Sequence, residues 1–195
     1  MTVDRGLKKI LHLDIKEVFL LYVLKHHGPL GRYRLVHVLN LPEGIVRGLL
    51  SRLQQRGYIT ANQRGSNLTN LGDKELNKRL TKLHISAIEL FDGGYFNVGP
   101  TCIAIHITNA KKQPRLGIKE RDTAIKAGAL GAITLEFRNG SIIMSGLANI
   151  SQDSPVVAKL MKSQFNLKNN DVILIVFADN LWRAIEGGLF AASLK

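Results

Sequence analysis

The 195-residue sequence has few of the residues on which covalent cross-links and metal sites depend. It contains one cysteine, Cys102, which excludes an internal disulfide framework and any cysteine-based structural zinc site. We expect Cys102 to be a buried thiol that behaves as a small apolar side chain. Five of the six histidines lie in the first 84 residues without the tight spacing of metal ligands: His12, His26, His27, His37 and His84. The sequence therefore predicts neither a metal site nor a cofactor.

A long hydrophobic segment is also missing. No apolar run is longer than residues 18–24, which fall well short of the roughly 18 to 20 residues that span a bilayer. No charged segment followed by a hydrophobic one opens the chain, as a secretion signal would. Low-complexity tracts are absent, prolines number only five, and apolar residues make up 45% of the chain, which together exclude a disordered basic tail. We expect a folded, cytoplasmic protein that does not enter a membrane.

Acidic residues are scarce relative to basic ones, and the imbalance is uneven along the chain. The totals of 27 Lys and Arg against 15 Asp and Glu give a formal charge of +12. Residues 1–84 carry 15 basic and 6 acidic side chains, whereas residues 85–195 carry 12 and 9. Most of the excess positive charge is thus in the first part, which points to a polyanionic partner there. We infer two domains, residues 1–84 and residues 85–195, each long enough to bury a core.

The apolar residues of the basic part recur with helical spacing. They predict, in order, helices over residues 14–27, 32–39 and 42–55, a hairpin over residues 58–69, and a polar helix that ends near residue 83. In the third helix, Pro42 occupies the first position, and Val46, Leu50 and Leu53 form the apolar side. Its outward side carries Gly44, Arg47, Gly48, Ser51, Arg52 and Gln55. The turn of the hairpin contains a further arginine, Arg64.

Two runs of residues carry a resemblance to a known family. The first is Val46-x3-Leu50-x2-Leu53-x3-Gly57-Tyr58-Ile59, and the second, after the basic hairpin, is Leu68-Thr69-x2-Gly72. Together they resemble the recognition helix, the wing and the following helix of winged helix-turn-helix transcription regulators. The resemblance covers roughly residues 12–83. It implies a winged helix-turn-helix domain that binds double-stranded DNA.

The predicted third helix suits duplex DNA, because a helix of this length fits the major groove and its glycines allow close approach. The hairpin turn would meet the minor groove or the backbone, and the second helix would meet phosphates. The predicted DNA-binding residues are Arg32, Arg34, Arg47, Ser51, Arg52, Gln55 and Arg64. The alternative that these arginines only solvate a helical surface stays open. RNA binding ranks below duplex binding, because few exposed aromatic residues are available to stack on bases.

Residues 85–195 alternate between short strands, glycine-containing loops and helices, with a hairpin turn at residues 138–140. This mixed order predicts a small α+β domain, so the fold class of the whole chain is α+β. The stretch of residues 117–132, taken with the upstream winged helix, resembles an archaeal family of winged-helix proteins whose C-terminal domain has no assigned function. The likeness covers nearly the whole chain. It implies a transcription regulator, but it carries over no ligand or catalytic residue.

The second domain shows no recognisable catalytic motif. No Ser-His-Asp or Cys-His set can be nominated from spacing alone, and His106 on a predicted strand fits a structural role. Basic side chains at the predicted helix start near Gly117 favour an anionic small-molecule effector. In the alternative, the arginine of this segment pairs with its acidic neighbour and the glycines form ordinary turns. The residues assigned to the effector are Lys119, Arg121, Asp122, Gly128 and Gly131.

These features lead to one functional hypothesis and two rivals. The hypothesis is a DNA-binding transcription regulator that forms a homodimer, in which the second domain dimerises, senses a small molecule, or both. The apolar final helix, near residues 180–194, is the expected interface between the two copies. The first rival is an enzyme whose site lies in residues 85–195, tethered by the basic domain. The second is a winged-helix adaptor that docks another protein. We expect no enzymatic activity, with residues 85–195 left open on this point.

Overall fold

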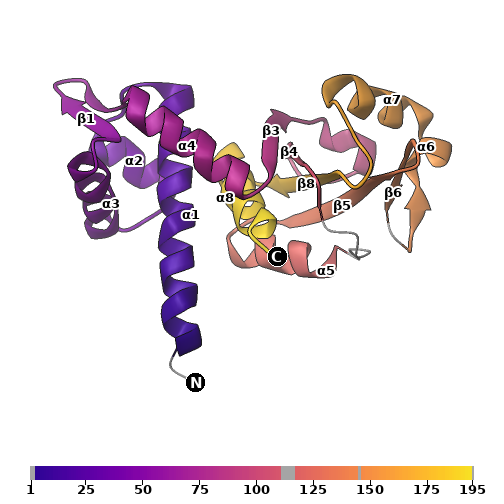
Figure 1. The fold of residues 1–195 in the computed structure, drawn as a ribbon, viewed down its shortest axis with the longest axis horizontal. Coiled ribbons are helices and arrows are strands. Elements are labelled where there is room, and N and C mark those ends of the chain that lie inside the picture. Colours follow the sequence, from indigo (N-terminus) through magenta and orange to yellow (C-terminus); the bar gives the residue numbers. More distant parts are fainter. Residues whose placement is uncertain (1–2, 111–116, 145, 195) are drawn as a thin grey trace. The chain divides into compact units, whose positions relative to one another are not determined.

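The structure is a computed structural model that describes residues 3–110, 117–144 and 146–194, with side chains from residue 15 onward (Figure 1). The chain divides into two compact units, Met1–Leu80 and Thr81–Lys195, whereas the sequence suggested a boundary after His84. Unit 1 consists mainly of helices, and unit 2 is built around a sheet. The α+β fold class predicted from the sequence is therefore confirmed. In the described part of the chain, no helix combines the length and hydrophobicity needed to cross a membrane.

Unit 1 has the element order of a winged helix-turn-helix domain. Its elements are helices α1 (Val3–His27), α2 (Arg32–Leu39), α3 (Glu43–Gln55) and α4 (Asn70–Lys82), with a hairpin of β1 (Ile59–Asn62) and β2 (Gly65–Leu68) between α3 and α4. The predicted helix over residues 32–39 is confirmed. The predicted start of the first helix at Asp14 is wrong, because α1 begins at Val3. Leu7, Ile10 and Leu11 extend the apolar helical spacing upstream of Asp14, so Asp14 and Glu17 lie within the helix and not at its start.

Each helix of unit 1 contributes an apolar stripe to one core. In α3, Val46, Leu49 and Leu53 are fully buried at offsets of three and four, while Leu50 is only half-buried. Helices α1, α2 and α4 and strand β1 add fully buried side chains of their own, among them Phe19, Leu20, Leu35, Leu39, Ile59 and Leu76. This packing leaves the opposite side of α3 in contact with solvent.

Two glycines hold the hairpin against the helices. Gly65, with a φ of +119°, lies so close to the backbone of Leu30 that no Cβ atom would fit there. Beside this contact, Leu30 and Ser66 exchange backbone hydrogen bonds of 3.0 and 2.9 Å. Gly72 of α4 packs directly against the carbonyl of Tyr58. A side chain at either position would push the hairpin away from the helical core.

Unit 2 is built on one antiparallel sheet. Within the described residues, the strand order is β3-β4-β8-β5-β6-β7, and every neighbouring pair is antiparallel. The strands are β3 (Ile85–Leu90), β4 (Thr101–Ile107), β5 (Gly131–Arg138), β6 (Ser141–Met144), β7 (Ala148–Asn149) and β8 (Val172–Ala178). The helices are η1 (Gly93–Phe96), α5 (Ile118–Lys126), α6 (Ile150–Asp153), α7 (Pro155–Gln164) and α8 (Leu181–Ala192). The short elements η1, β7 and α6 were not predicted.

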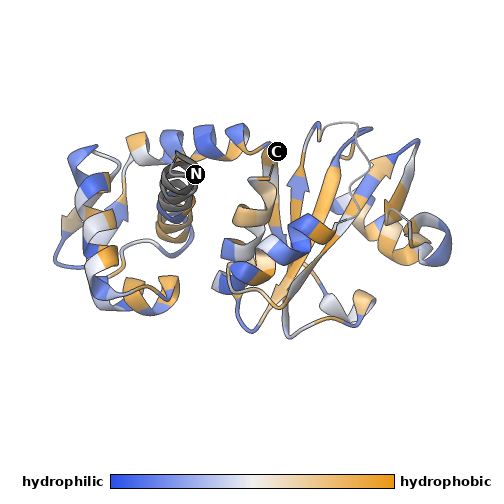
Figure 2. Ribbon diagram, turned by 90° about the horizontal axis from the view of Figure 1, so that it is seen from below, coloured by the Kyte–Doolittle hydropathy of each residue, from blue (hydrophilic) through white to orange (hydrophobic). Residues whose placement is uncertain are grey.

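Helices cover both faces of this sheet, and its apolar strands lie between them (Figure 2). On one face, α5 and α8 pack on β4, β5 and β8, where Gly188 lies against Ile105. On the other face, Val157 of α7 belongs to the same apolar cluster as Cys102 of β4. The expected burial of Cys102 is confirmed. Burial raises the pKa of its thiol to about 11, and the negative charge of Asp92 adds to the effect.

Helix α8 is part of the core of unit 2. Ile185 and Leu189 are 3% and 0% exposed, and Gly187 lies against Ala124 of α5. The sequence predicted this apolar helix as an interface between two copies of the chain. That prediction is wrong for Ile185 and Leu189, because both side chains are already buried within the chain.

Candidate functional site

Helix α3 presents one exposed stripe of short and polar residues. Gly44, Arg47, Ser51 and Gln55 are exposed and follow one another at intervals of three or four residues, which places them on one face of the helix. No described carboxylate pairs with Arg47, so its guanidinium can reach a ligand. A helix with this face fits the major groove of duplex DNA, where an arginine can donate to guanine or to a phosphate.

The hairpin turn carries Arg64 at the tip of the wing. Strand β1 ends at Asn62 and β2 begins at Gly65, which leaves Gln63 and Arg64 as the turn. Asn62 Oδ1 accepts a 2.8 Å hydrogen bond from the backbone N–H of Arg64 and so stabilises the turn. The Arg64 side chain is exposed, and in the described part of the chain no carboxylate pairs with it. It is available to contact a phosphate.

Arg52 belongs to the same helix but binds a buried carboxylate of α1. Its Nε donates to Glu17 Oε1 at 3.1 Å. The Nη1 atoms of Arg56 and Arg79 both donate to Glu17 Oε2, also at 3.1 Å. Glu17 is 4% exposed. Its buried carboxylate thus connects α1 with Arg52 of α3, with Arg56 at the C-terminal cap of α3, and with Arg79 of α4. Sequence reasoning missed this cluster, although a glutamate beside the apolar run of α1 was a signal for it.

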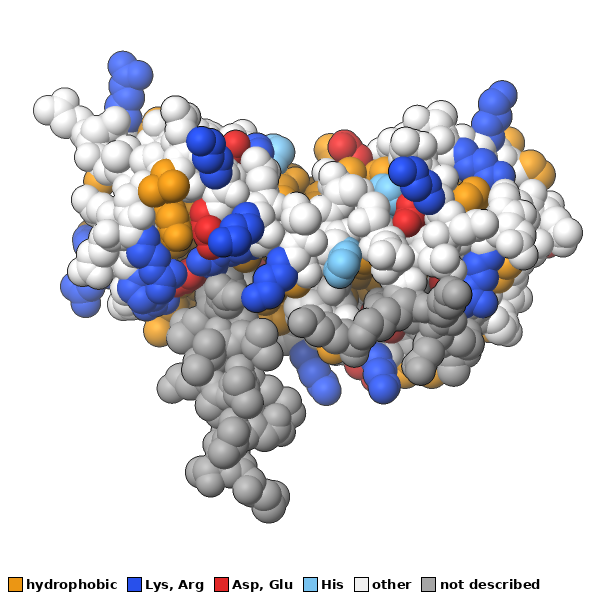
Figure 3. Space-filling model, viewed as in Figure 1, with side chains coloured by type: hydrophobic (Ala, Val, Ile, Leu, Met, Phe, Trp, Pro, Cys, Tyr) orange, Lys and Arg blue, Asp and Glu red, His pale blue; other side chains and the backbone are white. Residues whose placement is uncertain are grey.

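Of the two arginines of α2, Arg32 pairs with a carboxylate, whereas Arg34 pairs with no described carboxylate. Arg32 Nε lies 3.2 Å from Glu43 Oε1 at the start of α3, and its guanidinium lies 5.5 Å from the centre of the Tyr33 ring. Arg32 and Arg52 thus each pair with a carboxylate of the protein. The other predicted DNA-binding residues pair with no described carboxylate: Arg34, Arg47, Ser51, Gln55 and Arg64. Lys and Arg side chains gather on the visible face of unit 1 (Figure 3).

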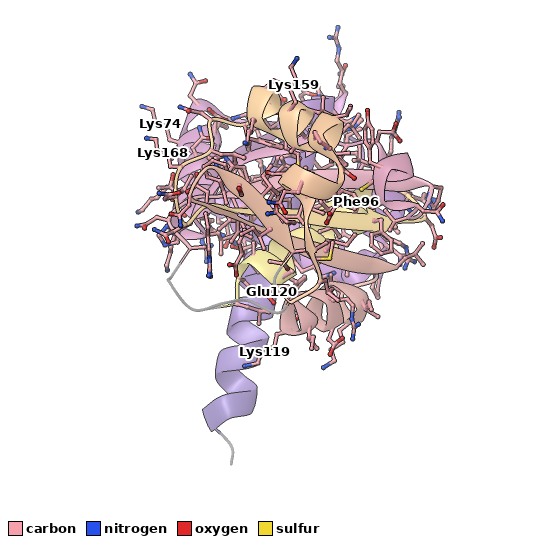
Figure 4. The ribbon with its side chains drawn as sticks, turned by 90° about the vertical axis from the view of Figure 1, so that its right-hand side faces the viewer. Lys74, Phe96, Lys119, Glu120, Lys159 and Lys168 are labelled. Carbon is pink, nitrogen blue, oxygen red and sulfur yellow. The ribbon has the colours of Figure 1, made fainter. Side chains whose placement is uncertain are left out.

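The residues predicted to bind an anionic effector are spread along α5. Lys119 and Arg121 are exposed in its first half, and Figure 4 labels Lys119. Arg121 Nη2 lies 3.0 Å from Asp122 Oδ1, the ion pair that was the alternative considered from the sequence. Gly128 and Gly131 follow the other end of this nine-residue helix, which spans about 13 Å. The assignment of these five residues to one effector stays a prediction.

Unit 2 contains an open cavity that the sequence did not predict. It has a volume of about 710 Å³ and lies where the start of β3 and the end of β4 meet the loop between α7 and β8. Its polar lining includes Ser86, His106, Thr108, Asn109, Lys168 and Asp171. Among the residues that the structure describes, no group of three or more His, Cys, Asp or Glu side chains is placed to hold a metal ion.

Three of the lining side chains form a hydrogen-bonded chain. Ser86 Oγ lies 2.7 Å from His106 Nδ1, and His106 Nε2 lies 2.8 Å from Asp171 Oδ2. His106 and Asp171 are 5% and 3% exposed, whereas Ser86 is exposed to solvent. His106 has the buried and partnered position of a structural histidine, as the sequence suggested. It also links a buried carboxylate to an exposed hydroxyl, which the sequence did not suggest.

The surroundings of Asp171 keep its carboxylate charged. Burial alone would raise the pKa of Asp171, but hydrogen bonds outweigh this effect and hold the pKa below its ordinary value of 3.8. The backbone N–H of Lys168 donates to Oδ2 at 2.9 Å, and the backbone N–H of Asn109 donates to Oδ1 at 3.0 Å. An ionised carboxylate only accepts hydrogen bonds, so the facing His106 Nε2 carries a proton.

A β-bulge turns Ser86 toward His106. Along β3 and β4, Ile85 pairs with Ile107 and Ala87 pairs with His106, so Ser86 is an extra residue without a partner in β4. Its Oγ also lies 3.3 Å from the carbonyl oxygen of His106. Neither glycine nor proline occurs at this bulge, and no other local sequence signal marks it. Sequence reasoning therefore had no means of finding Ser86.

Comparisons with known proteins relate both parts of the chain to sequences without an assigned activity. Residues 14–74 match the PH0730-like, N-terminal domain, and residues 98–194 match a domain of unknown function (DUF4443). The search of the curated proteins finds no significant match. Among solved structures, the chain is similar to "Hypothetical protein PH0730 from Pyrococcus horikoshii OT3", with 26% identity, a TM-score of 0.68, and coverage of 91% of this chain and 90% of that chain. The sequence predicted a resemblance to archaeal proteins, and the similarity to this Pyrococcus protein confirms that resemblance.

Proposed function

We propose that the protein is a DNA-binding transcription regulator that reads duplex DNA with unit 1. The observation that carries this proposal is the exposed stripe of α3, on which Arg47, Ser51 and Gln55 share one face while the opposite face is buried. In the proposed complex, α3 lies in the major groove, and Arg64 of the wing contacts the minor groove or the backbone. Arg34 contacts a phosphate, which sets the register on the duplex without reading sequence.

The charge of the basic part supports this proposal. Residues 1–84 carry 15 basic and 6 acidic side chains, a net charge of +9, against +3 for residues 85–195. Positive charge concentrated in this way attracts the phosphate backbone, and binding releases counterions from the DNA. The affinity for DNA should therefore fall steeply as salt is added, and a salt titration measures this fall.

A winged-helix adaptor that docks another protein through α3 has less support. Ile45, at 46% exposed, is the one exposed large apolar side chain described on this helix. A protein-docking face usually offers a larger contiguous apolar patch with few charges at its centre. The exposed stripe of α3 instead combines Arg47 with glycine, serine and glutamine, a composition that suits a polyanion better.

Arg52 and Arg32 take supporting roles in the proposed complex. Each already pairs with a carboxylate of the protein, so a DNA phosphate would have to compete with Glu17 or Glu43. Arg52 connects α3 to α1 and so helps to hold the exposed stripe in one orientation. We therefore assign direct contact with DNA first to Arg47, Ser51, Gln55 and Arg64.

We further propose that the regulator is a cytoplasmic homodimer and that unit 2 binds an anionic effector at Lys119 and Arg121. Two copies related by a two-fold axis would present two α3 helices to successive turns of DNA. Analytical ultracentrifugation tests the dimer.

A thermal-shift screen against phosphorylated metabolites tests the effector site. If the effector binds at Arg121, the Arg121→Ala variant should lose the rise in unfolding temperature that the effector causes in the wild type. Equal shifts for this variant and the wild type would reject the site.

Titration of labelled duplex DNA at increasing salt tests the main proposal. Arg47→Ala and Arg64→Ala each remove one charged contact, so each should weaken binding about tenfold and lower the salt slope by about one. Lys159→Ala is the matched control, because it removes one positive charge from an exposed position on α7 of unit 2, outside the proposed effector site. This control should bind DNA as the wild type does. Absence of binding at low salt, or an equal loss in all three variants, contradicts the proposal.

A further inference from the structure

We propose that Ser86 is a nucleophile that accepts an acyl group from small polar esters, with His106 as its general base. Asp171 is the positioning residue that orients the imidazole and stabilises its protonated form. The site lies wholly within unit 2 and does not depend on DNA binding by unit 1. The proposal assigns an enzymatic role to residues 85–195, the part of the chain for which the sequence left this open.

The hydrogen bonds define which ring nitrogen of His106 acts as the base. Asp171 Oδ2 accepts from Nε2 at 2.8 Å, so Nε2 carries a proton. In the neutral imidazole, Nδ1 therefore has a free lone pair, and it accepts the hydroxyl proton of Ser86 at 2.7 Å. An adjacent base held by a third group is the arrangement that activates a weak hydroxyl nucleophile. Here Nδ1, rather than Nε2, faces the hydroxyl.

Ser86 is the member of this chain that a substrate can reach. A purely structural pair needs only His106 and Asp171, and both are buried. The bulge in β3 adds a hydroxyl in hydrogen-bonding contact with the imidazole and leaves it exposed in the open cavity. Bulges next to active sites often re-aim a side chain in this way. The Phe165 ring, centred 5.6 Å from the His106 ring, packs against the imidazole and restricts its movement.

The lining of the cavity selects the class of substrate. Thr108, Asn109 and Lys168 supply a hydroxyl, an amide and an ammonium group. Such groups suit a small polar ester, and the Asn109 amide and the Lys168 ammonium can donate to the negative charge that develops on its carbonyl oxygen. The apolar residues of the described lining are Ala87 and Phe165, which offer little surface to a long hydrocarbon chain.

The proposed reaction balances with water as the second substrate. Ser86 Oγ forms a bond to the ester carbonyl carbon, and its proton passes to His106 Nδ1. The tetrahedral intermediate expels the alkoxide, which takes this proton and leaves as the alcohol. Water then attacks the acyl group on Ser86 and gives a proton to Nδ1. When the acyl–oxygen bond breaks, Ser86 Oγ recovers that proton and the carboxylic acid leaves.

Acylation can be measured on the full chain with two probes, p-nitrophenyl acetate and a fluorophosphonate. We expect release of nitrophenolate and a mass increase of one acetyl or phosphonyl group on the peptide that contains Ser86. Ser86→Ala should abolish this label, and His106→Gln should slow its formation by about 100-fold. Ser163→Ala is the matched control, because Ser163 is also exposed but donates its proton to the Leu160 carbonyl. This control should label as the wild type does.

Two single cysteine variants test the proposal even if His106→Gln fails to fold. Ser86→Cys puts a thiol beside the imidazole, whereas Ser163→Cys puts one at an exposed site on α7. Iodoacetamide should alkylate the first thiol at least about tenfold faster at neutral pH, since the base promotes the thiolate. Circular dichroism and thermal unfolding of Ser86→Ala should match the wild type. Absence of a label on Ser86, a label that persists in Ser86→Ala, or equal alkylation rates would overturn the proposal.

Discussion

Glu17 Oε1 accepts a hydrogen bond from Arg52 Nε at 3.1 Å, and this contact ties α1 to the helix that we propose reads DNA. Glu17 is buried, and Arg56 and Arg79 share its second oxygen. A buried carboxylate is tolerated only when its charge is compensated, and three guanidinium groups provide the compensation here. The orientation of α3 therefore depends on a side chain that has no DNA contact in the proposed complex.

Glu17→Gln should destabilise unit 1. The neutral amide leaves three arginines without their shared negative charge, and the free energy of unfolding should fall by about 2 kcal/mol. This value is below that of a fully buried ion pair because Arg52 and Arg56 reach solvent. Urea unfolding followed by circular dichroism measures the change.

Glu43→Gln is the matched control for this substitution. Glu43 pairs with Arg32 at the surface, where both side chains are close to half exposed. Its replacement should change the free energy of unfolding by less than about 0.5 kcal/mol. Equal effects of the two substitutions would show that the buried position of Glu17 has no special importance for stability.

Two arginines of α3 should separate stability from DNA affinity. Arg47→Ala removes an exposed guanidinium, so DNA affinity should fall about tenfold while stability stays within about 0.5 kcal/mol. Arg52→Ala removes a hydrogen bond to buried Glu17, so the free energy of unfolding should fall by about 1 kcal/mol. Both variants need a binding titration and a urea unfolding curve. Weaker binding by Arg52→Ala at unchanged stability would instead identify Arg52 as a direct DNA contact.

Acid should weaken unit 2 through Asp171. Its pKa in the folded state lies below the ordinary value of 3.8, so the folded state binds fewer protons than the unfolded state in that range. The stability from this carboxylate is present above pH 3.8 and is lost as the pH falls through the lower folded-state pKa. Asp171→Asn should flatten the acid limb of a plot of stability against pH. Asp122→Asn, at an exposed ion pair, should leave the limb unchanged.

Gly72→Ala should destabilise unit 1 even though alanine favours helices. The new Cβ would overlap the carbonyl of Tyr58, so the hairpin must shift, at a cost of about 2 kcal/mol. At Gly44, in the first turn of α3, a Cβ would have no described atom within 4 Å. Gly44→Ala should therefore stabilise the protein by up to about 1 kcal/mol. Thermal unfolding of the two variants should shift in opposite directions, and shifts of the same sign would contradict the packing at Gly72.

Local patterns in the sequence determined most of the secondary structure of this protein. The spacing of Val46 and Leu53 predicts α3, and the alternation of Ile103 and Ile105 predicts β4. Such predictions succeed because the faces of helices and strands repeat every three to four and every two residues, whatever the rest of the chain does. Charge counts along the sequence likewise marked residues 1–84 as the basic part, because a count needs no fold.

Only the tertiary structure decided which polar side chains meet. Arg52 lies 35 residues from Glu17 in the sequence, and Asp171 lies 65 residues from His106, so no local spacing links either pair. The fold of unit 1 brings Arg52 to Glu17, and the pairing of β4 with β8 brings His106 to Asp171, within hydrogen-bonding distance. Burial then requires each carboxylate to find donors, because water no longer solvates it. The fold therefore determines which arginine pairs with a carboxylate of the protein, and which serine lies beside a histidine.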